Sequence, residues 1–546
     1  MRLLQAGLSC IVLAAVLIAA DNLNGRCELE LKLVDAASGQ PLPGLVQITA
    51  ADGGRVPLPE LLSRGLGLKT EPINRWSVLP GAVRLSLPQG KLTISALAGL
   101  ETELATATVD LSGLTHKSLS LPLTRFYRAA EQGLRSGNTH LHLMNLTREA
   151  ADRYLREIPR ADSLDLLFVS YLERAGADRD YISNRYTLAD LEALAATSGV
   201  AFGNGEEHRH NFLAQGQGYG HVMLLDLQEL VQPVSIGPGI MKIGSDGLPL
   251  QRGIDAARRQ KSTVIWCHNA YGLEDIPNWA TARLAAQNIF DGGPHGSYQD
   301  TFYRYLNAGL RVPFSTGTDW FIYDFSRVYV RLPQSAHAAP PGAPRGAGWN
   351  AERGAEWLAG LTAGRSYITN GPLLEFQVAG RDLGDTLALA GPGTVEVTCR
   401  AQGRGDFERL ELIQNGQVIA SAASQPVAGH FAAELRQTLR IERSCWLALR
   451  TPPPPVQAAG EAPAPPKALN ELGQPLFSHT SAIYVEVAGR RVFDADVVRG
   501  LIAEMESSLP EITRQGKFQD DQERLRVEDV YRDGIAALRR RLVENP

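Results

Sequence analysis

The stretch SGNTHLHLM, residues 136–144, contains two histidines one residue apart in an otherwise apolar run. Side chains at positions i and i+2 of a β-strand point to the same face of the sheet. His140 and His142 therefore reach a common point, while Leu141 and Leu143 pack behind them. Imidazole is a common ligand for zinc and related ions. The stretch indicates either a metal site or two half-exposed histidines at a sheet edge. Other motifs of the chain distinguish between these two interpretations.

The region around this stretch, residues 126–375, alternates strand-like and helical segments. Strand-like runs include THLHLM, DLLFVS, VAFGNGE, HVMLLDL, TVIWCHN and VPFSTGT, and helical runs include TLADLEALAATSG, GIDAARRQ, WATARLAAQ and YQDTFYRYLNAG. This alternation predicts an α/β fold with a parallel sheet. In α/β barrels the functional groups lie at the carboxyl ends of the strands, and several of these runs end in polar residues.

The flanking regions have different patterns. Residues 27–125 alternate apolar and polar positions between Gly/Pro turns, which predicts a β-sandwich-like domain of immunoglobulin or transthyretin type. Residues 376–490 return to a β pattern and predict a second β-sandwich-like domain, interrupted by a Pro-rich loop at 451–467. Residues 491–546 have helical apolar spacing and predict a helical tail.

Composition and the N-terminus narrow the class of protein. The chain has 546 residues and a formal net charge of −5, and no Lys/Arg-rich face stands out, so no nucleic-acid partner is expected. Residues 1–20 contain the apolar run IVLAAVLIAA, which is short for a membrane span and is typical of a signal peptide. We therefore predict an exported protein (periplasmic, cell-surface or secreted) with no integral membrane span after signal cleavage.

Cysteines are few for a disulfide-stabilised protein. Cys399 and Cys445 belong to strand-like runs of the same C-terminal region, and either a disulfide between them or two buried thiols is compatible with export. Cys267 precedes His268 on a strand, so its side chain is expected to point away from that histidine into the core.

Further metal-binding side chains follow the first pair within the α/β region. The stretch GNGEEHRHNF places Glu206, Glu207, His208 and His210 just past a strand. His221 begins the next strand-like run, and His268 and Asp319 each end one. Imidazole and carboxylate groups gathered at strand ends are what a hydrolytic metal centre requires, because they hold the ions that activate water. Taken together, these positions favour the metal site over the sheet edge.

The order of these motifs resembles the polymerase-and-histidinol-phosphatase (PHP) superfamily. Within it, GEEHRHNF…GYGHVMLL and WLAGLTAGRSYITNGPLL resemble the carbaryl-hydrolase-like (CehA/McbA) branch, over about residues 130–375. The resemblance implies a distorted (β/α)7 PHP barrel, here flanked by N- and C-terminal β-sandwich-like domains. It also implies two divalent metal ions, Zn, Mn or Fe. The first would be held by His140, His142, Glu207 and Asp319, and Glu207 would bridge to a second held by His221 and His268.

The chain also departs from the family pattern. Tyr171 and Leu172 replace an Asp-His pair, and Phe321 replaces the histidine of an Asp-x-His motif. The resemblance therefore implies that the third PHP metal site is lost. If Leu172 and Phe321 form an apolar wall there, a doubly charged phosphomonoester is a poor substrate. Neutral esters, carbamates and bulkier phosphodiesters are then favoured.

The remaining polar candidates are assigned to substrate or proton transfer. Residues 208–210 are interpreted as a loop over the site, with His208, His210 and Arg209 as catalytic groups. A solvated surface loop is the alternative. Substrate-orienting roles are considered beside packing or capping roles for a second set: Asn269, Trp320, Arg365 and Asn370.

These observations predict an exported metal-dependent hydrolase. Its dinuclear centre would activate water against an ester, carbamate, amide or phosphoester bond of a small-molecule or glycan-linked substrate. The alternative is a non-catalytic surface protein with a degenerate barrel that binds glycans or protein partners. The replacements at residues 171, 172 and 321 favour this alternative, and the complete set of groups for a dinuclear site argues against it.

Overall fold

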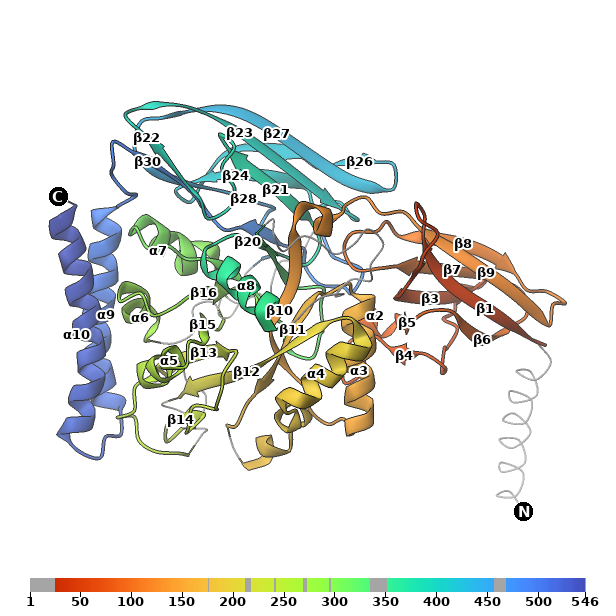
Figure 1. The fold of residues 1–546 in the computed structure, drawn as a ribbon, viewed down its shortest axis with the longest axis horizontal. Coiled ribbons are helices and arrows are strands. Elements are labelled where there is room, and N and C mark those ends of the chain that lie inside the picture. The colour runs from red at the N-terminus through yellow and green to blue at the C-terminus, as the bar shows by residue number, and fades with distance from the viewer. Residues whose placement is uncertain are drawn as a thin grey trace, which may run out of the picture.

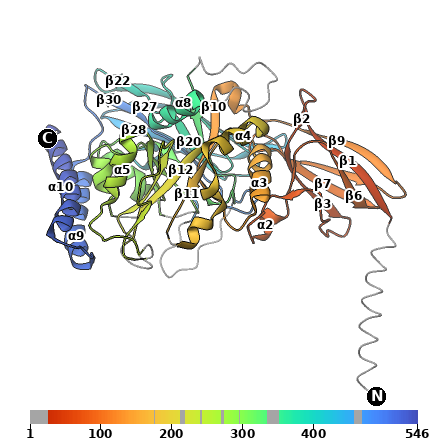
Figure 2. The same ribbon diagram turned by 60° about the horizontal axis from the view of Figure 1, so that its bottom comes forward.

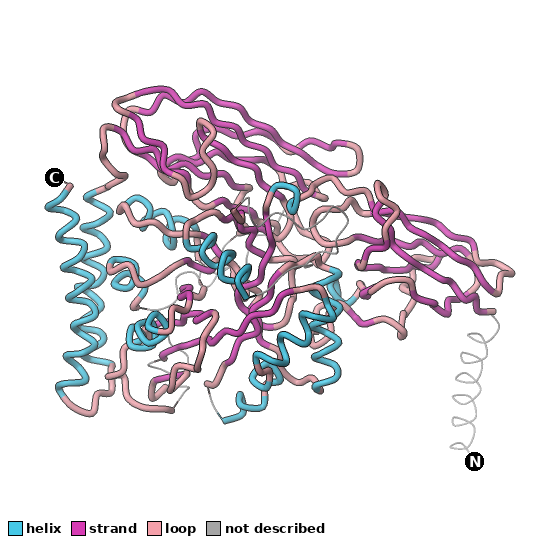
Figure 3. Tube along the Cα trace, viewed as in Figure 1, coloured by secondary structure: helices cyan, strands magenta, loops and turns pink. Residues whose placement is uncertain are grey.

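The computed structural model has a mixed α/β architecture with one large curled sheet and several β-sandwich-like sheets (Figures 1 and 3). It describes residues 25–545 except 175, 212–217, 240–241, 269–272, 294–295, 334–350 and 456–467. The predicted signal peptide, Asn269 and most of the predicted loop at 451–467 therefore lie outside the described residues.

Two sheets pack face to face at the N-terminal end (Figure 2). In β1 the burial alternates with period 2, so that Cys27, Leu29, Leu31 and Leu33 are fully buried between the sheets. Because every second side chain of β1 is apolar, the strand buries that face against the opposite sheet. The strands are β1 (Arg26–Asp35), β2 (Pro41–Leu42), β3 (Gly44–Ala50), β4 (Leu62–Ser63), β5 (Ser77–Leu79), β6 (Val83–Pro88), β7 (Lys91–Leu97), β8 (Ala105–Asp110) and β9 (His116–Leu123).

A buried ion pair joins this sandwich to the rest of the chain. Arg64 and Asp162 are both fully buried, and the guanidinium donates to both carboxylate oxygens, Nε at 3.1 Å and Nη2 at 2.5 Å. Arg64 also donates to the backbone carbonyl of Ile322. Because each buried charge has its partner, the sandwich is held in a defined position against the central sheet.

The central sheet carries the histidine pair. Its strands β10, β11 and β12 are parallel neighbours, as are β15, β16 and β17, and β10 also pairs with β18 and β19. The bounds are β10 (Leu134–His142), β11 (Leu166–Tyr171), β12 (Ala201–His210), β13 (Gly220–Leu225), β14 (Ser235–Ile236), β15 (Thr263–Trp266), β16 (Ala286–Asn288), β17 (Phe314–Ser315), β18 (Asp319–Trp320), β19 (Arg327–Arg331) and β20 (Ser366–Thr369).

Of the strands β10 to β19, β13 and β19 each run antiparallel to both of their neighbours. β13 is antiparallel to both β12 and β15, so the expectation of a purely parallel arrangement is wrong at this point. The reversal has a consequence for the site. The first residues of an antiparallel strand lie at the same edge as the last residues of its neighbours, which brings His221 opposite Arg209.

Helices cover the outside of the curled sheet (Figure 1). They begin where the sequence supplies caps: Thr147 caps α3, and Thr187 forms a capping box with Asp190 in α4. The helices are α2 (Glu71–Asn74), α3 (Arg148–Ala161), α4 (Leu188–Ser198), α5 (Leu250–Arg259), α6 (Asp275–Ala280), α7 (Arg304–Asn307) and α8 (Ala351–Thr362). Shorter turns are η1 (Ala129–Gln132), η2 (Gly176–Asp180), η3 (Ile182–Arg185) and η4 (Gln299–Tyr303).

The helix expected over residues 279–287 is wrong for most of its length. α6 ends at Ala280, and residues 286–288 form the buried strand β16. The apolar residues of this segment are compatible with either element, because a short buried strand has no distinguishing periodicity.

The C-terminal strands extend the central sheet across the predicted boundary near residue 375, because β20 pairs with β29. A separate sheet of order β21-β23-β27-β26 packs near them. Cys399 and Cys445 are buried free thiols. The strands are β21 (Leu373–Val378), β22 (Thr386–Leu389), β23 (Gly393–Gly403), β24 (Arg409–Gln414), β25 (Gln417–Ala423), β26 (Gln425–Val427), β27 (His430–Ile441), β28 (Cys445–Arg450), β29 (Ser478–Thr480) and β30 (Ile483–Val487).

Two long helices, α9 (Ala495–Gln515) and α10 (Asp521–Glu544), form an antiparallel pair that packs against α6 (Figure 1). Asp494 and Asp520 cap their first turns. The turn between the helices is anchored through Lys517, whose backbone N–H donates to Asp246 at 2.7 Å. Within the described part of the chain, no helix has both the length and the apolar character needed to cross a membrane.

Candidate metal centre

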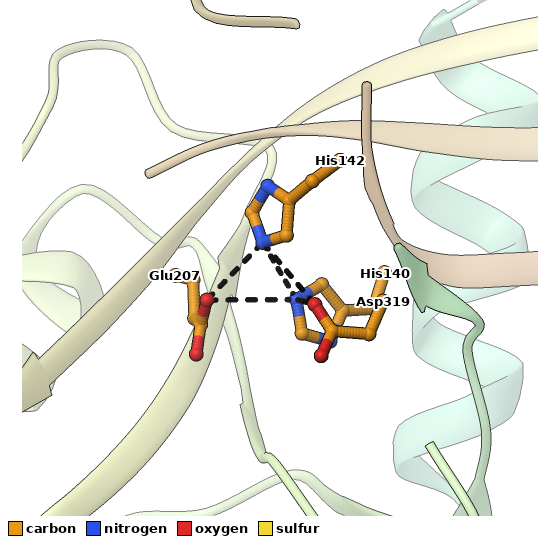
Figure 4. A group of neighbouring side chains, drawn as sticks. All are labelled: His140, His142, Glu207 and Asp319. Carbon is orange, nitrogen blue, oxygen red and sulfur yellow. Dashed lines mark hydrogen bonds and ion pairs between the residues drawn. The ribbon is translucent and has the colours of Figure 1, made fainter. Parts of the chain in front are cut away.

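Four side chains from three parts of the central sheet meet at one point (Figure 4). His140 and His142 come from β10, Glu207 from β12 and Asp319 from β18. The Nε2 atoms of the two histidines lie 2.9 Å apart, and His142 Nε2 lies 3.1 Å from Glu207 Oε2. Asp319 Oδ1 lies 3.5 Å from His140 Nε2 and 3.7 Å from His142 Nε2. Ligands of a tetrahedral zinc ion are separated by roughly 3.4 Å, so these four atoms have the spacing of a metal site.

A second group adjoins the first through the same glutamate. Glu207, His221 and His268 bring ligand atoms within 4.8 Å of one another, and Glu207 Oε1 lies 3.4 Å from His221 Nδ1. The two carboxylate oxygens of Glu207 thus face different groups. The sequence-based choice of Glu207 over Glu206 is consistent with this geometry, because Glu206 points to the other side of β12 and contacts His208.

Hydrogen bonds hold three of the histidines with Nε2 directed at the cluster. His142 Nδ1 donates to the carbonyl of Ser170 at 3.0 Å, and His268 Nδ1 donates to the carbonyl of Asp291 at 2.9 Å. His140 Nδ1 donates to the Asp291 carboxylate at 2.6 Å. A carbonyl or carboxylate on Nδ1 fixes the tautomer and leaves the Nε2 lone pair for a metal ion.

The Nε2 atoms of His140 and His142 are too close for two facing lone pairs. At 2.9 Å a cation, either a proton or a metal ion, must lie between them. Without metal, burial alone would lower the pKa of His140, but Asp291 and Asp319 raise this pKa to about 9. The pair is therefore built to hold positive charge.

Glu207 and His221 have the protonation states that bind a metal ion. Burial alone would raise the pKa of Glu207, but Arg209 and the neighbouring histidines hold this pKa well below its usual range. Burial, together with the Arg209 charge, lowers the pKa of His221 well below its usual value. Glu207 is therefore ionised and His221 neutral near pH 7, which are the forms that bind a metal ion.

Several acceptors in this cluster lack hydrogen bonds. Glu207 Oε1, Asp319 Oδ1 and Asp291 Oδ1 are buried, and none of them accepts a hydrogen bond from a described residue. Buried polar atoms are rarely left in this state, because desolvation without a partner is costly. Their accumulation at one point indicates that these oxygens are placed for a cation.

The backbone is strained at two of the predicted ligands. His268 and Asp319 have φ angles of 55° and 57°, in the left-handed region that favours glycine. Such conformations persist at functional sites, where the surrounding fold holds them. Cys267 is fully buried in the hydrophobic core, as predicted. Its Sγ and ligand atoms of His140 and Asp291 lie within 4.8 Å of one another.

The interpretation of residues 208–210 as a loop over the site is also wrong. All three residues belong to β12, and their side chains alternate between its two faces. His208 is fully buried on the face opposite Glu207, where Nδ1 lies 2.9 Å from Glu206 Oε1 and Nε2 accepts from Arg252 at 3.3 Å. His210 lies on that same face, 3.2 Å from Asp246 and stacked on Tyr219. Only Arg209 shares the face of Glu207, with Nη1 3.3 Å from Oε1.

The predicted substrate residues are found in different environments. The Trp320 ring centroid lies 5.1 Å from that of His142, beside the first group. Asn370 uses its amide to donate to Asp324 and to accept from the backbone N–H of Phe477, so the packing role is favoured over the substrate role. The side chain of Arg365 lies near α8. Its Nη2 atom would be 3.7 Å from a Cβ atom added to Gly360 of that helix.

The apolar wall expected from Leu172 and Phe321 is not built as predicted. Phe321 packs its ring edge-to-face against Tyr154, and its ring atoms would collide with a Cβ on Gly67 in the N-terminal sandwich. It is therefore part of the contact between α3 and that sandwich. Leu172 is fully buried, and its backbone N–H is held by Asn184.

Asp291 is the site residue that sequence reasoning missed. It follows β16 in the stretch QNIFDGG and contacts His140 through its carboxylate and His268 through its carbonyl. An aspartate just after a strand is the same signal that identified Asp319. The helix predicted over residues 279–287 leaves no strand before Asp291, so the sequence pattern does not place this residue at a strand end.

No protein-family model matches the chain, and no curated protein matches its sequence.

Proposed function

We propose that this protein is an exported metal-dependent hydrolase with a PHP-type barrel. One observation carries the proposal: Glu207 directs its two carboxylate oxygens at two adjoining groups of buried ligand atoms. A carboxylate shared between two ion sites is typical of dinuclear hydrolytic centres. The buried oxygens of Glu207 and Asp319 that lack hydrogen bonds support the same proposal.

The two ions would be held by the groups already described, His140, His142, Glu207 and Asp319 on one side, and Glu207, His221 and His268 on the other. Divalent ions in such a centre supply an activated water and polarise the scissile oxygen of an ester, carbamate, amide or phosphoester. The chain itself contributes orientation and charge. Asp291 holds His140 and His268 in place, and Arg209 keeps Glu207 ionised.

The finer description of the fold belongs to this proposal. A distorted (β/α)7 PHP barrel is supported by the parallel strands around β10 and by the gathering of the motif residues at one edge of them. The antiparallel strand β13 would be the distortion.

The test is metal analysis beside a substrate panel. Purified protein is analysed by inductively coupled plasma mass spectrometry and assayed on p-nitrophenyl esters, carbamates and phosphoesters. We expect about two divalent ions per chain, with turnover that chelation abolishes and Zn²⁺, Mn²⁺ or Fe²⁺ restores. His140→Ala and Asp319→Ala are expected to lose the first ion and activity, whereas His430→Ala, a change in the C-terminal β region, retains both. Bound metal without any turnover would favour the non-catalytic glycan- or protein-binding alternative.

Export is tested separately, by N-terminal sequencing of protein from its native host. A mature chain that begins near Asp21 outside the cytoplasm is expected. A soluble cytoplasmic form that retains Met1 would contradict this part of the proposal.

A further inference from the structure

Arg209 occupies a position at the metal centre that no ligand role explains. It lies on the same face of β12 as Glu207, two residues nearer the end of the strand, and directly opposite His221 of β13. Its side chain is 11% exposed, whereas that of Glu207 is 2% exposed. Arg209 is thus about as exposed as the neighbouring His221 and His268, at 8% and 10%, and lies beside the second ligand group.

The donors of this guanidinium are incompletely used. Nη1 forms the ion pair with Glu207 at 3.3 Å, and Nε is buried and donates to no described residue. The nearby Arg174 is different, because Asp178 binds its Nε at 2.8 Å and its Nη2 at 3.2 Å, and that carboxylate compensates its charge. Arg209 thus differs from Arg174 in sharing its carboxylate, Glu207, with the proposed metal ions.

The counter-ion of Arg209 is shared with the metal groups. Glu207 is the carboxylate next to Arg209, and it is also the proposed bridge between two ions. The carboxylates of Glu207, Asp319 and Asp291 carry three negative charges, whereas two divalent ions and Arg209 would carry five positive charges. The loaded site would therefore be net positive, and its outermost cation would need an anion from elsewhere.

We propose that Arg209 binds an oxyanion of the substrate, so that the preferred substrate carries a carboxylate or phosphate oxyanion next to the scissile bond. This inference rests on the proposed hydrolase function and narrows its substrate class. The planar guanidinium presents donors in a fork that matches these oxyanions. On the other side of the first group, Trp320 lies beside His142 and beneath Arg174, with 5.0 Å between the Arg174 guanidinium carbon and the ring centroid.

The inference changes the substrate expected from sequence. The expected apolar wall of Leu172 and Phe321 favours neutral esters, carbamates and bulkier phosphodiesters. Phe321 packs against Tyr154 instead, and Arg209 Nε has no hydrogen-bond partner among the described residues. Monoanionic substrates are therefore expected to be better than neutral substrates of the same size.

The test compares matched substrates in the metal-loaded protein. p-Nitrophenyl hemisuccinate is paired with p-nitrophenyl valerate, and methyl p-nitrophenyl phosphate with methyl p-nitrophenyl carbonate. We expect Arg209→Gln to lower kcat/KM at least about thirtyfold more for the anionic member of a pair than for the neutral member, mainly through KM. A loss shared by both members reports the contact of Arg209 with Glu207. Arg209→Lys is expected to retain part of the preference. A preference that the variant loses only in the hemisuccinate pair indicates a carboxylate, and one that it loses only in the methyl phosphate pair indicates a phosphate.

Two controls keep the result interpretable. Arg252 of α5 contacts His208 on the opposite face of β12. Arg252→Gln is expected to leave kcat/KM unchanged for both members of each pair. Metal content is measured in every variant. An equal loss of turnover on anionic and neutral substrates, or a loss of metal in Arg209→Gln, would overturn the inference, because Arg209 would then act only by positioning Glu207.

Direct binding separates this inference from the proposed function. Inorganic phosphate and acetate are titrated calorimetrically into the metal-loaded wild type and Arg209→Gln proteins. Weaker binding by at least about tenfold in the variant supports the oxyanion role even if no ester is turned over. Equal binding to both proteins would refute the role even if the wild type is an active hydrolase.

Discussion

Glu206, His208 and His210 project from one face of β12, and Glu207 and Arg209 project from the other. Both faces are buried, and both carry acidic and basic groups. On the first face Glu206 and His208 satisfy one another and a nearby loop: Glu206 Oε1 lies 2.9 Å from His208 Nδ1, and Glu206 Oε2 accepts from the backbone N–H of Val231 at 2.7 Å. On the second face, Glu207 Oε1 and Arg209 Nε have no hydrogen-bond partner among the described residues.

The difference shows how a structural polar network is distinguished from a binding site. Residue types are nearly the same on the two faces, so composition cannot separate them. A network that stabilises the fold saturates its donors and acceptors, because each unsatisfied buried group reduces stability. A site for an external ion or substrate has to leave some of them open. The following predictions test this distinction, in order of decreasing effect.

The largest effect is expected from replacing one of the two adjacent glutamates, Glu207, by glutamine, with the same change at Glu206 as its comparison. Glu207→Gln should weaken binding of both ions by at least about a hundredfold and remove most turnover, because a neutral amide bridges two cations poorly. Glu206→Gln should retain full metal content but lower the free energy of unfolding by about 1–3 kcal/mol, since its hydrogen bonds with His208 and Val231 are disturbed. Metal analysis and urea unfolding of both variants measure this contrast. Metal loss confined to the Glu206 variant would reverse the assignment of the two faces.

A smaller effect on metal is expected from Asp291, which holds His140 without facing solvent. Asp291→Asn should weaken metal binding by about 10- to 100-fold, because the amide no longer fixes the tautomer and orientation of the imidazole. The matched change on the other face is Asp246→Asn, which disturbs the contact with His210 but is expected to leave metal affinity unchanged. Competition with a chromogenic chelator measures both affinities. Equal weakening in the two variants would mean that the effect is unspecific.

The packing around His208, on the first face of β12, is tested by a substitution at Gly253 of α5. A Cβ at this position would lie 2.1 Å from His208 Nε2, so Gly253→Ala should destabilise the fold by about 1–3 kcal/mol. Gly500→Ala on α9 is the control, because no atom lies within 4 Å of its Cβ, and this change should stabilise by about 0.5–1 kcal/mol. Chemical unfolding of each variant gives the two values. A stabilised Gly253→Ala protein would show that His208 is loosely packed.

The smallest effect concerns His479, another histidine whose two nitrogens are satisfied by the protein. Tyr303 donates to its Nε2 at 2.7 Å, and its Nδ1 lies 2.8 Å from the carbonyl of Thr480. Burial and the nearby Arg450 lower the pKa of His479 to about 3, below the value of about 6.5 in an unfolded chain. The folded state therefore binds fewer protons, so this contribution to stability is fully present above pH 6.5 and is lost as the pH falls toward 3.

His479→Gln isolates this contribution because glutamine does not titrate. The free energy of unfolding of the wild type relative to the variant should fall by about 1 kcal/mol between pH 6.5 and 5.5, with no change in metal content. Urea unfolding at several pH values measures the difference. A wild type and variant with parallel pH profiles would contradict the lowered pKa.

Much of the candidate site is readable from spacing alone. An i, i+2 pair on a strand has one orientation, so His140 and His142 had to share a face. The same alternation separates Glu207 from Glu206, because adjacent residues on a strand point to opposite faces. Prolines, glycines and alternating patterns also indicated the β character of the two regions that flank the α/β segment, since these signals are local.

Other features depended on contacts between segments distant in sequence. The antiparallel direction of β13, which brings His221 to the strand-end cluster, is not determined by the residues of β13 themselves. Nor does the sequence reveal that Asp291 approaches His140, or that Phe321 turns toward the sandwich. His208 and Arg209 are neighbours in the chain, yet one is saturated and the other keeps unused donors. Local spacing determined which side chains share a face, because that follows from backbone geometry. Only the tertiary structure decided which of them have partners, because partners come from other segments of the chain.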